Sequence, residues 1–500
     1  MKLKAKIHRI EAGEPVVVLN KEDAEEMGIF VSDRVRISAD GKSATALVDL
    51  TASVVKKGEI GLLRDVWKVL PVEEDQIVDV VPTERPKSVD YIRKKIDGLE
   101  LHGHEIREIV QDIVDNNLSG IELGAFITST YITPYTMDET VALTNAMVET
   151  GKQMDFGTAV VDKHCIGGVA GNRTTMLIVP IVAAAGLTIP KTSSRAITSP
   201  AGTADTMGVL ADVEFEMDEL IGIVKKTGGC IIWGGNVNLA PADDKIIRVE
   251  YPLSIDPEGQ LLASVMAKKK SIGSDYVVID IPVGVGAKVK DIDTADKLAH
   301  KFIELGKRLG ISVKCLVTDG SEPIGRGIGP ALEARDVLLS LDNKGPRNLT
   351  GKSLDLAGIL IEMSGKVQKG KGRDLAEEIL SSGAAMMKMR EIIDEQNGNP
   401  DIKPDDIIIG KNVHEVKSAH KGVIRGIDNK LISHVARAAG APKDPEAGVY
   451  LNMIKGDCVN KGDTLFTIYA TKGWKLDEAI ALTRRSPPVD VGGVILEEVD

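Results

Sequence analysis

The stretch DKHCIGGVAGNRTTM, Asp162 to Met176, decides how the central part of this chain folds. It follows the apolar run AVV, places a lysine and a histidine before a glycine-rich turn, and continues into the apolar sequence LIVPIV. This order predicts a strand, a tight loop and a helix whose N-terminus favours negative charge. Lys163 and Arg173 add charge, and Thr174 and Thr175 add hydroxyls. We therefore expect an anion site, with a tight turn carrying solvated charges as the alternative interpretation.

A second loop of similar chemistry follows in KTSSRAITSPAGTADTMG, Lys191 to Gly208. Hydroxyl groups and a guanidinium fork suit phosphate and sugar oxygens. The hydroxyl residues around Arg195 are Thr192, Ser193, Ser194, Thr198, Ser199 and Thr203. Because each loop follows a strand-like run, we expect both loops at the carboxyl edge of one sheet, where they converge on a phosphate site.

The surrounding pattern predicts an α/β protein with additional modules. Residues 152–405 alternate short apolar strands with longer helices, which favours a largely parallel sheet covered by helices. We expect a β-rich, barrel-like module at 1–84 and a helical domain at 88–160 with a further helical part near 240–275. The α/β phosphate-binding domain is expected at 161–405, and an α+β region at 406–500.

Composition excludes several classes of protein. The net charge of -12 argues against a general nucleic-acid or membrane binder. Four distant cysteines without a CxxC motif (Cys165, Cys230, Cys315 and Cys458) indicate reduced thiols rather than disulfides or a zinc site. No secretory h-region occurs near Met1, and the longest apolar run is too short to span a bilayer. We expect a cytoplasmic protein without a metal site.

Several motifs resemble the thymidine and pyrimidine-nucleoside phosphorylases. VDKHCIGGVAG is similar to their VDKHSTGGVGD segment, and SSRAITSPAGTADTMG resembles their signature S-G-R-G-L-x-x-T-G-G-T-x-D-x-L-E. IRKKIDG, ASVMAKK, EPIGRGIGPALEARD and MSGKVQKGKG resemble other family segments in the same order, from Ser88 to the C-terminus. The resemblance implies the thymidine phosphorylase fold, with a helical domain, a large α/β domain and a C-terminal barrel-sandwich region. It also implies inorganic phosphate as co-substrate and no cofactor.

The departures from that family resemble its archaeal AMP phosphorylase branch. Cys165 and Ile166 replace a serine and a threonine, Gly208 replaces a glutamate, and Lys288 follows GVGA where an apolar residue is usual. The extra N-terminal module also matches this branch. The resemblance implies reversible conversion of AMP and phosphate to adenine and ribose 1,5-bisphosphate in nucleotide salvage or degradation, with CMP and UMP as further substrates. It implies a homodimer through the helical domain and larger homo-oligomers through the terminal domains.

The resemblance also assigns the site residues. Asp256 matches the proton donor to the leaving base, and Lys288 is the candidate for holding the 5′-phosphate dianion. The positions that match nucleotide contacts are Gly168, Ser194, Arg195, Ala196, Ile197, Thr198, Ser199, Thr203, Ser264 and Lys288. Further candidates are Lys163 and Thr174 for the attacking phosphate, Arg248 and Lys268 near the base, and His164 in an orienting role.

Three alternatives stay open at this stage. A thymidine or pyrimidine-nucleoside phosphorylase would act on nucleosides rather than nucleotides. A phosphoribosyltransferase of related fold would need magnesium-binding carboxylates, which the sequence does not reveal. A non-enzymatic assembly protein would use the two terminal β modules and show no phosphate-dependent turnover.

Overall fold

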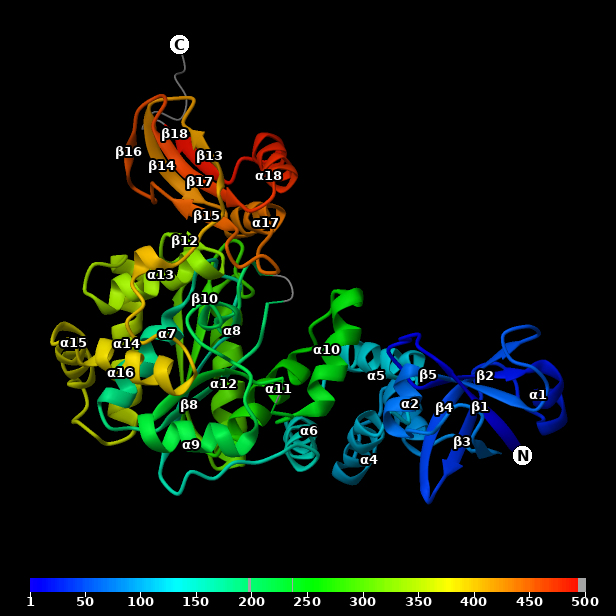
Figure 1. Ribbon diagram of the computed structural model, residues 1–500. Coiled ribbons are helices and arrows are strands. Elements are labelled where there is room, and N and C mark those ends of the chain that lie inside the picture. Colours follow the sequence, from blue (N-terminus) through cyan, green and yellow to red (C-terminus); the bar gives the residue numbers. More distant parts are fainter. Residues whose placement is uncertain (197–198, 236, 493–500) are drawn as a thin grey trace, which may run out of the picture. The chain divides into compact units, whose positions relative to one another are not determined.

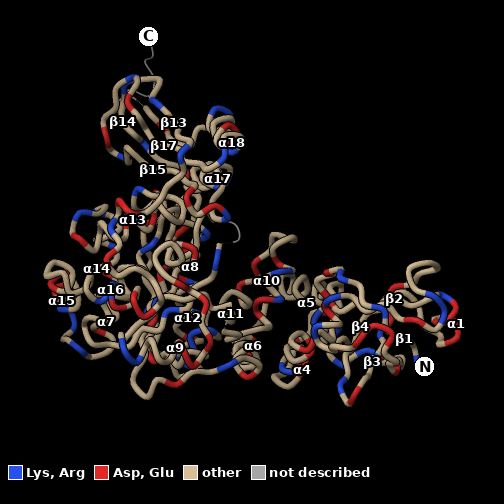
Figure 2. The backbone as a smooth tube through the Cα atoms, in the orientation of Figure 1, with Lys and Arg blue, Asp and Glu red and all other residues tan. Residues whose placement is uncertain are grey.

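A computed structural model describes residues 1–196, 199–235 and 237–492 of the chain. It divides into two compact units, Met1–Gly151 with Ala240–Ala267 and Lys152–Leu239 with Lys268–Asp500. Figure 1 labels the elements along the chain. In Figure 2, basic and acidic residues are interspersed along both units, so the net charge of -12 is spread along the chain.

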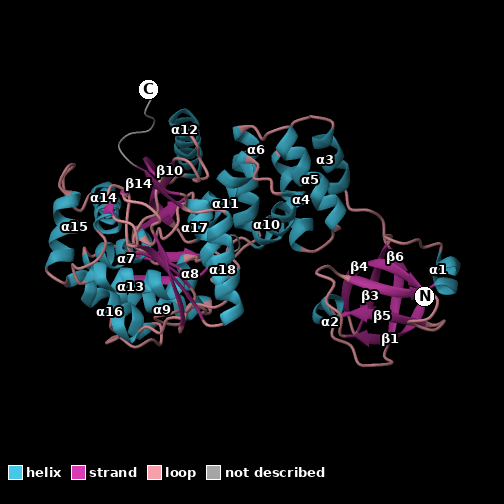
Figure 3. Ribbon diagram, turned by 90° about the horizontal axis from the view of Figure 1, so that it is seen from above, coloured by secondary structure: helices cyan, strands magenta, loops and turns pink. Residues whose placement is uncertain are grey.

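The N-terminal module of the first unit is a closed six-stranded barrel, visible in Figure 3. The strand order is β1-β5-β2-β4-β3-β6, with β1 parallel to β5 and β2 parallel to β4. Alternation fills the barrel, since Leu3 and Ala5 of β1 are buried between exposed lysines. The elements are β1 (Lys2–His8), β2 (Val16–Asn20), α1 (Lys21–Met27), β3 (Arg34–Ala39), β4 (Lys42–Thr51), β5 (Glu59–Leu63), α2 (Arg64–Val69) and β6 (Ile77–Pro82).

The helical part of the first unit combines two segments of the chain. One core contains apolar residues from positions 92–148 and from positions 240–267, so the second segment completes the bundle begun by the first. The helix Gly103–Val114 buries an apolar stripe of Ile106, Ile109 and Ile113. Thr136 with Glu139 forms the capping box that begins α6. The helices are α3 (Ser88–Ile96), α4 (Gly103–Val114), α5 (Gly120–Ile132), α6 (Met137–Glu149), α10 (Pro241–Leu253) and the first part of α11 (Glu258–Ser271).

The α/β part of the second unit has parallel strands covered by helices. β7 (Val160–Cys165), β10 (Ser274–Val283) and β11 (Ser312–Asp319) form one parallel sheet, and β8 (Ile189–Ser193) pairs in parallel with β9 (Gly229–Trp233). A parallel bridge between Val160 and Thr188 joins the two sheets. The helices are α7 (Thr174–Ala184), α8 (Thr203–Met207), α9 (Met217–Thr227), α12 (Ile292–Leu309), α13 (Pro330–Leu341), α14 (Arg347–Met363), α15 (Gly372–Ser381) and α16 (Ala384–Glu395).

The C-terminal α+β region packs onto the α/β part within the same unit. Its strands form the sheets β12-β15-β17-β13 and β16-β14-β18, and β12 comes from the α/β segment, so the sheet joins the two parts. The elements are β12 (Gly327–Ile328), η1 (Pro404–Asp406), β13 (Asn412–Lys417), β14 (Gly422–Ile427), α17 (Asn429–Ala439), β15 (Gly448–Leu451), β16 (Cys458–Val459), β17 (Thr464–Ala470), α18 (Gly473–Arg485) and β18 (Val489–Gly492). The predicted fold class is confirmed.

Candidate active site

The loops predicted to bind phosphate lie after parallel strands, but β7 and β8 belong to two sheets, joined by the Val160–Thr188 bridge, rather than to the single sheet expected. β7 ends at Cys165 and is followed by the glycine-rich loop, after which α7 begins at Thr174. β8 ends at Ser193 and is followed by the hydroxyl-rich loop, after which α8 begins at Thr203. The carboxyl ends of parallel strands are the usual position of ligand sites in α/β sheets.

A cluster of four buried or nearly buried lysines lies beside the glycine-rich loop. Lys163 is 1% exposed, and its Nζ donates to Thr174 Oγ1 at 3.0 Å and lies 3.7 Å from Asp280 Oδ2. Lys352 Nζ lies 3.0 Å from the same Asp280 oxygen and donates to Thr318 Oγ1 at 3.0 Å. Lys163 therefore reaches the N-terminus of α7 while sharing its counterion with Lys352.

Asp162 holds the other two lysines of the cluster. Its Oδ2 accepts from Lys269 Nζ at 2.5 Å, and its Oδ1 lies 3.4 Å from Lys191 Nζ. Burial would raise the pKa of Asp162, but Lys191 and Lys269 outweigh burial and hold that pKa below its ordinary value. Burial, with the charge of Lys269, lowers the pKa of Lys191 to about 7 against the opposing pull of Asp162.

We call Lys163, Lys191, Lys269 and Lys352 the lysine cluster. Its two carboxylate partners, Asp162 and Asp280, are both fully buried. Four ammonium groups against two carboxylates leave two positive charges in excess when every lysine is protonated. Uncompensated buried charge is costly, so the cluster favours an incoming anion.

His164 and Cys165 lie at the end of β7 without the features of catalytic groups. Burial, reinforced by Lys269 and Lys191, holds the pKa of His164 well below its usual range, so its imidazole is neutral at pH 7. Burial and Asp280 raise the pKa of the Cys165 thiol, and the Asn172 amide donates to its sulfur at 3.4 Å. A reactive thiol needs a lowered pKa, so Cys165 is not activated as a nucleophile.

Arg173 ties the two loops together. Its guanidinium donates to the buried carboxylate of Glu333, to Thr203 Oγ1 at 3.1 Å and to the Ala201 carbonyl at 2.8 Å. The sequence suggested that Arg173 adds positive charge for the anion, but the structure gives three of its donors to protein groups. Glu333 also accepts from Thr206 Oγ1 at 3.0 Å, which joins α8 to α13.

Gly168 places the glycine-rich loop directly against the loop that carries Lys288. Its φ is +90°, and a Cβ there would collide with the backbone nitrogen of Lys288 and lie 2.9 Å from Ala287 Cα. Only glycine fits this position. The Lys288 side chain is exposed, in the loop after β10.

The hydroxyl-rich loop is surface-accessible in its described part. Ser194, Arg195 and Ser199 are exposed and Ala196 is half-buried, whereas Ile197 and Thr198 lie outside the described residues. The Ala196 N–H donates to Asp205 Oδ2 at 2.7 Å, which holds the loop to α8. The Arg195 guanidinium lies 4.9 Å from the centre of the Trp233 ring and pairs with Glu214. These neighbours orient its side chain.

Other predicted residues lie on α10, on α11 or in the loop between them, all in the first unit except Lys268, which is the first residue of the second unit's later segment. Asp256 is exposed in the loop between α10 and α11, and Arg248 is exposed on α10. Ser264 is half-buried on α11 and donates to Asp243 Oδ2 at 2.9 Å. Lys268, four residues after Ser264 on the same helix, is half-buried.

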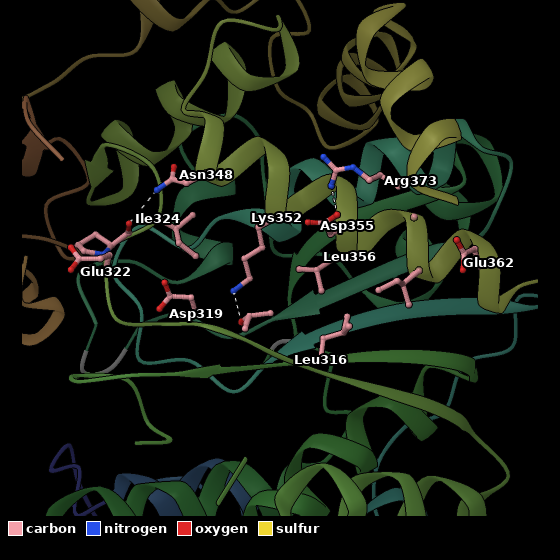
Figure 4. Close-up of a pocket in the computed structure, with 14 residues that line it drawn as sticks. Leu316, Asp319, Glu322, Ile324, Asn348, Lys352, Asp355, Leu356, Glu362 and Arg373 are labelled. Carbon is pink, nitrogen blue, oxygen red and sulfur yellow. Dashed lines mark hydrogen bonds and ion pairs between the residues drawn. The ribbon is translucent and has the colours of Figure 1, made fainter. Parts of the chain in front are cut away.

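A separate cavity of about 630 Å³ lies between β11 and α14. Figure 4 shows Lys352 among the side chains that line it and Arg373 paired with Asp355. Lys352 Nζ donates to Thr318 Oγ1, and both residues line the cavity. Of the predicted site residues that the structure describes, none lines this cavity, and Lys352 is the member of the lysine cluster that borders it.

Two absences hold for the described residues. No group of three or more His, Cys, Asp or Glu side chains there is arranged to hold a metal ion. None of the helices in that part of the chain is both long and apolar enough to cross a membrane.

Comparisons with known proteins match the whole length of the chain. The helical bundle domain of a glycosyl transferase family matches residues 89–151, the a/b domain of that family matches 157–386, and the pyrimidine nucleoside phosphorylase C-terminal domain matches 423–489. AMP phosphorylase of Thermococcus kodakarensis is 50% identical over 501 residues, covering 100% of this chain and 99% of that protein. AMP phosphorylase of Methanocella arvoryzae is 47% identical over 502 residues, covering 100% of both chains.

Among solved structures, anthranilate phosphoribosyltransferase from Thermus thermophilus superimposes with a TM-score of 0.54 at 19% identity. The match covers 62% of this chain and 100% of that one. At this identity the likeness concerns the fold alone.

Proposed function

We propose that this chain, which belongs to the AMP phosphorylase family, catalyses the reversible phosphorolysis of AMP to adenine and ribose 1,5-bisphosphate. CMP and UMP are further substrates in this proposal. The observation that carries the proposal is the lysine cluster, whose four ammonium groups exceed their two carboxylates beside the glycine-rich loop. An excess of two positive charges matches a phosphate dianion.

In the proposed reaction, inorganic phosphate binds beside the hydrogen-bonded pair of Lys163 and Thr174, at the N-terminus of α7. One phosphate oxygen attacks C1′ of the ribose as the C1′–N bond to the base breaks, and positive charge develops on the sugar. Asp256 gives a proton to a ring nitrogen of the leaving adenine. Its exposed position in the loop between α10 and α11, which Figure 1 labels, leaves it accessible to a base. No cofactor takes part.

The second phosphate, on the ribose 5′ carbon, is proposed to bind at Lys288, Gly168 and the loop from Ser194 to Ser199. The close packing of Gly168 against Ala287 and Lys288 supports this, because it brings two of the proposed contacts together. Thr203 lies at the end of this loop, where α8 begins, and Arg173 fixes the loop by donating to Thr203 Oγ1 and to the Ala201 carbonyl. Ser264 and Lys268 on α11, with Arg248 on α10, are proposed to face the base. The neutral His164 is proposed to orient the glycine-rich loop.

Assembly and location complete the proposal. The chain forms a homodimer or a larger homo-oligomer, supported by apolar side chains left open on α5, where Ile121 is 82% and Ile132 73% exposed. Four free cysteines, of which Cys458 is exposed, support a reducing, cytoplasmic location.

Incubation with AMP, CMP, UMP and their nucleosides, with and without phosphate, tests the function by release of free base. We expect phosphate-dependent release from the nucleotides and none from the nucleosides. Lys288→Ala should raise the KM for AMP, because one charge-assisted contact to the 5′-phosphate is lost, by about tenfold or more. Lys290→Ala, an exposed lysine two residues away, is the matched control. Equal use of adenosine and AMP by the wild type would refute the nucleotide assignment.

A further inference from the structure

Asp243 and Ser264 form a fixed pair in the first unit. Asp243 lies on α10 and is fully buried, and Ser264 lies on α11 and is half-buried. The Ser264 hydroxyl donates to Asp243 Oδ2 at 2.9 Å. Both helices belong to the same core, which contains Ala242 and Ile246 of α10 and Ala263 and Ala267 of α11, so packing on both sides holds the two side chains at this separation.

The chemistry of the pair sets the direction of the hydrogen bond. A hydroxyl has one proton and two lone pairs, and an ionised carboxylate can only accept. The hydroxyl hydrogen of Ser264 is therefore engaged in the hydrogen bond to Asp243, and the serine oxygen has only its lone pairs left for a ligand. Ser264 can accept a hydrogen bond from a base but cannot donate one.

We infer that Asp243 makes Ser264 an acceptor that selects bases carrying an exocyclic amino group. This rests on the proposed function, in which Ser264 faces the base. The N6 amino group of adenine and the N4 amino group of cytosine can donate to the serine oxygen. The keto oxygens at the same positions of hypoxanthine and uracil cannot, and they lose a hydrogen bond to water without a replacement. Asp243 is thus a positioning residue for specificity.

The test compares two pairs of substrates that differ mainly at that position, AMP with IMP and CMP with UMP. In the wild type we expect kcat/KM for the amino member of each pair to exceed that for the keto member by about tenfold, the usual effect of one satisfied against one unsatisfied polar group. Ser264→Ala should bring both ratios close to 1, mainly through a loss on AMP and CMP. Ser129→Ala is the matched control, because among the described residues that buried hydroxyl bonds to the Phe126 carbonyl of its own helix alone.

Asp243→Asn tests the positioning role. The amide can donate to the serine oxygen, which frees the hydroxyl proton for a keto group, so both ratios should fall. In the Ser264→Ala background the same substitution should leave the ratios where Ser264→Ala alone puts them, since Asp243 acts through Ser264. Circular dichroism and the thermal midpoint check that the variants are folded, and the ratio of two substrates on one enzyme does not depend on the fraction folded.

Three results would overturn the inference. One is a wild type whose kcat/KM for IMP and UMP equals that for AMP and CMP. Another is a Ser264→Ala variant that loses the same factor on all four nucleotides. The third is an Asp243→Asn effect on the ratios that persists without the serine hydroxyl. If AMP releases no adenine with phosphate, the proposed function itself fails and the inference falls with it; if AMP reacts but the ratios stay near 1, only the inference fails.

Discussion

Replacing Arg173 by methionine separates two interpretations of this arginine. In the structure its guanidinium bonds to Glu333, Thr203 and the Ala201 carbonyl, and the side chain is 11% exposed. If that is its role, Arg173→Met loosens the hydroxyl-rich loop and leaves a buried carboxylate without its cation. If instead the arginine binds the attacking phosphate, the variant loses phosphate affinity.

The size of the effect follows from burial. Removing one partner of a buried ion pair costs about 3–5 kcal/mol, and Glu333 is 1% exposed. At about 2–4 °C per kcal/mol for a domain of this size, the thermal midpoint should fall by roughly 6–20 °C. Glu333→Gln should also destabilise, but the double variant should lose less than the two single losses together, because the pair is already broken in each.

The pH dependence has a definite sign. Burial raises the pKa of Glu333, and Arg173 opposes that rise. Without Arg173 the pKa of the folded carboxyl moves further above its unfolded value of about 4.3. Such a group costs stability as pH rises from the unfolded pKa towards the folded one. The gap in stability between the wild type and Arg173→Met should therefore widen from pH 5 to pH 7.

The assay combines calorimetry of the four proteins with initial rates at varied AMP and phosphate. We expect a raised KM for AMP, because Thr203 and Ala201 lose their anchor, and a KM for phosphate within about threefold of the wild type. Strict additivity of the two substitutions, together with a tenfold or larger rise in the KM for phosphate, would refute the interpretation of Arg173 as a clasp between loops.

Two further predictions concern the same loops. Lys191→Met should remove a gain in stability that depends on pH, because Lys191 has a pKa of about 7 in the folded protein and about 10.4 in the unfolded chain. Between these values the stability of the wild type relative to the variant should rise by about 1.4 kcal/mol per pH unit. Denaturant unfolding from pH 7 to 9 measures this difference, and a difference that does not change with pH would contradict the prediction. Gly168 and Gly167 both have a positive φ, but of the two only Gly168 would bring an added Cβ into contact with other atoms. Gly168→Ala should therefore abolish most AMP cleavage, whereas Gly167→Ala should cost only the strain of a positive φ, about 1–2 kcal/mol of stability. Equal effects of the two variants on the rate and on the thermal midpoint would contradict this prediction.

The fold was accessible from sequence because its signals are local. The run AVVDKH before glycines and the run LIVPIV after them specify the strand, loop and helix of 160–184, and the structure has β7 and α7 there. Asn20 and Gly28 bound α1 as a cap and a left-handed stop, and Thr136 with Glu139 begins α6. Each of these needs only residues within a few positions of one another.

The lysine cluster was not predicted, because its members lie far apart in the chain. Asp162 pairs with Lys269, and Asp280 with Lys352, over separations that no local pattern encodes. A signal was nevertheless present, since Asp162 directly follows the apolar run AVV and Asp280 is the single carboxylate within the apolar run VVIDIPV. A charged residue in a buried strand needs a partner, so these two positions pointed to unidentified cations.

The long-range pairs also explain why the sequence alone could not show the partners of Arg173. An arginine in a glycine-rich loop looks available to a ligand until Glu333, 160 residues away, is known to take its guanidinium. The excess positive charge can then be assigned to particular residues. Carboxylates neutralise Arg173 fully but the lysine cluster only in part, so the unbalanced positive charge is concentrated at Lys163 and its neighbours rather than along the loop. A dianion that enters there replaces the missing counter-charge, and it should bind more weakly as pH rises past 7 and Lys191 loses its proton.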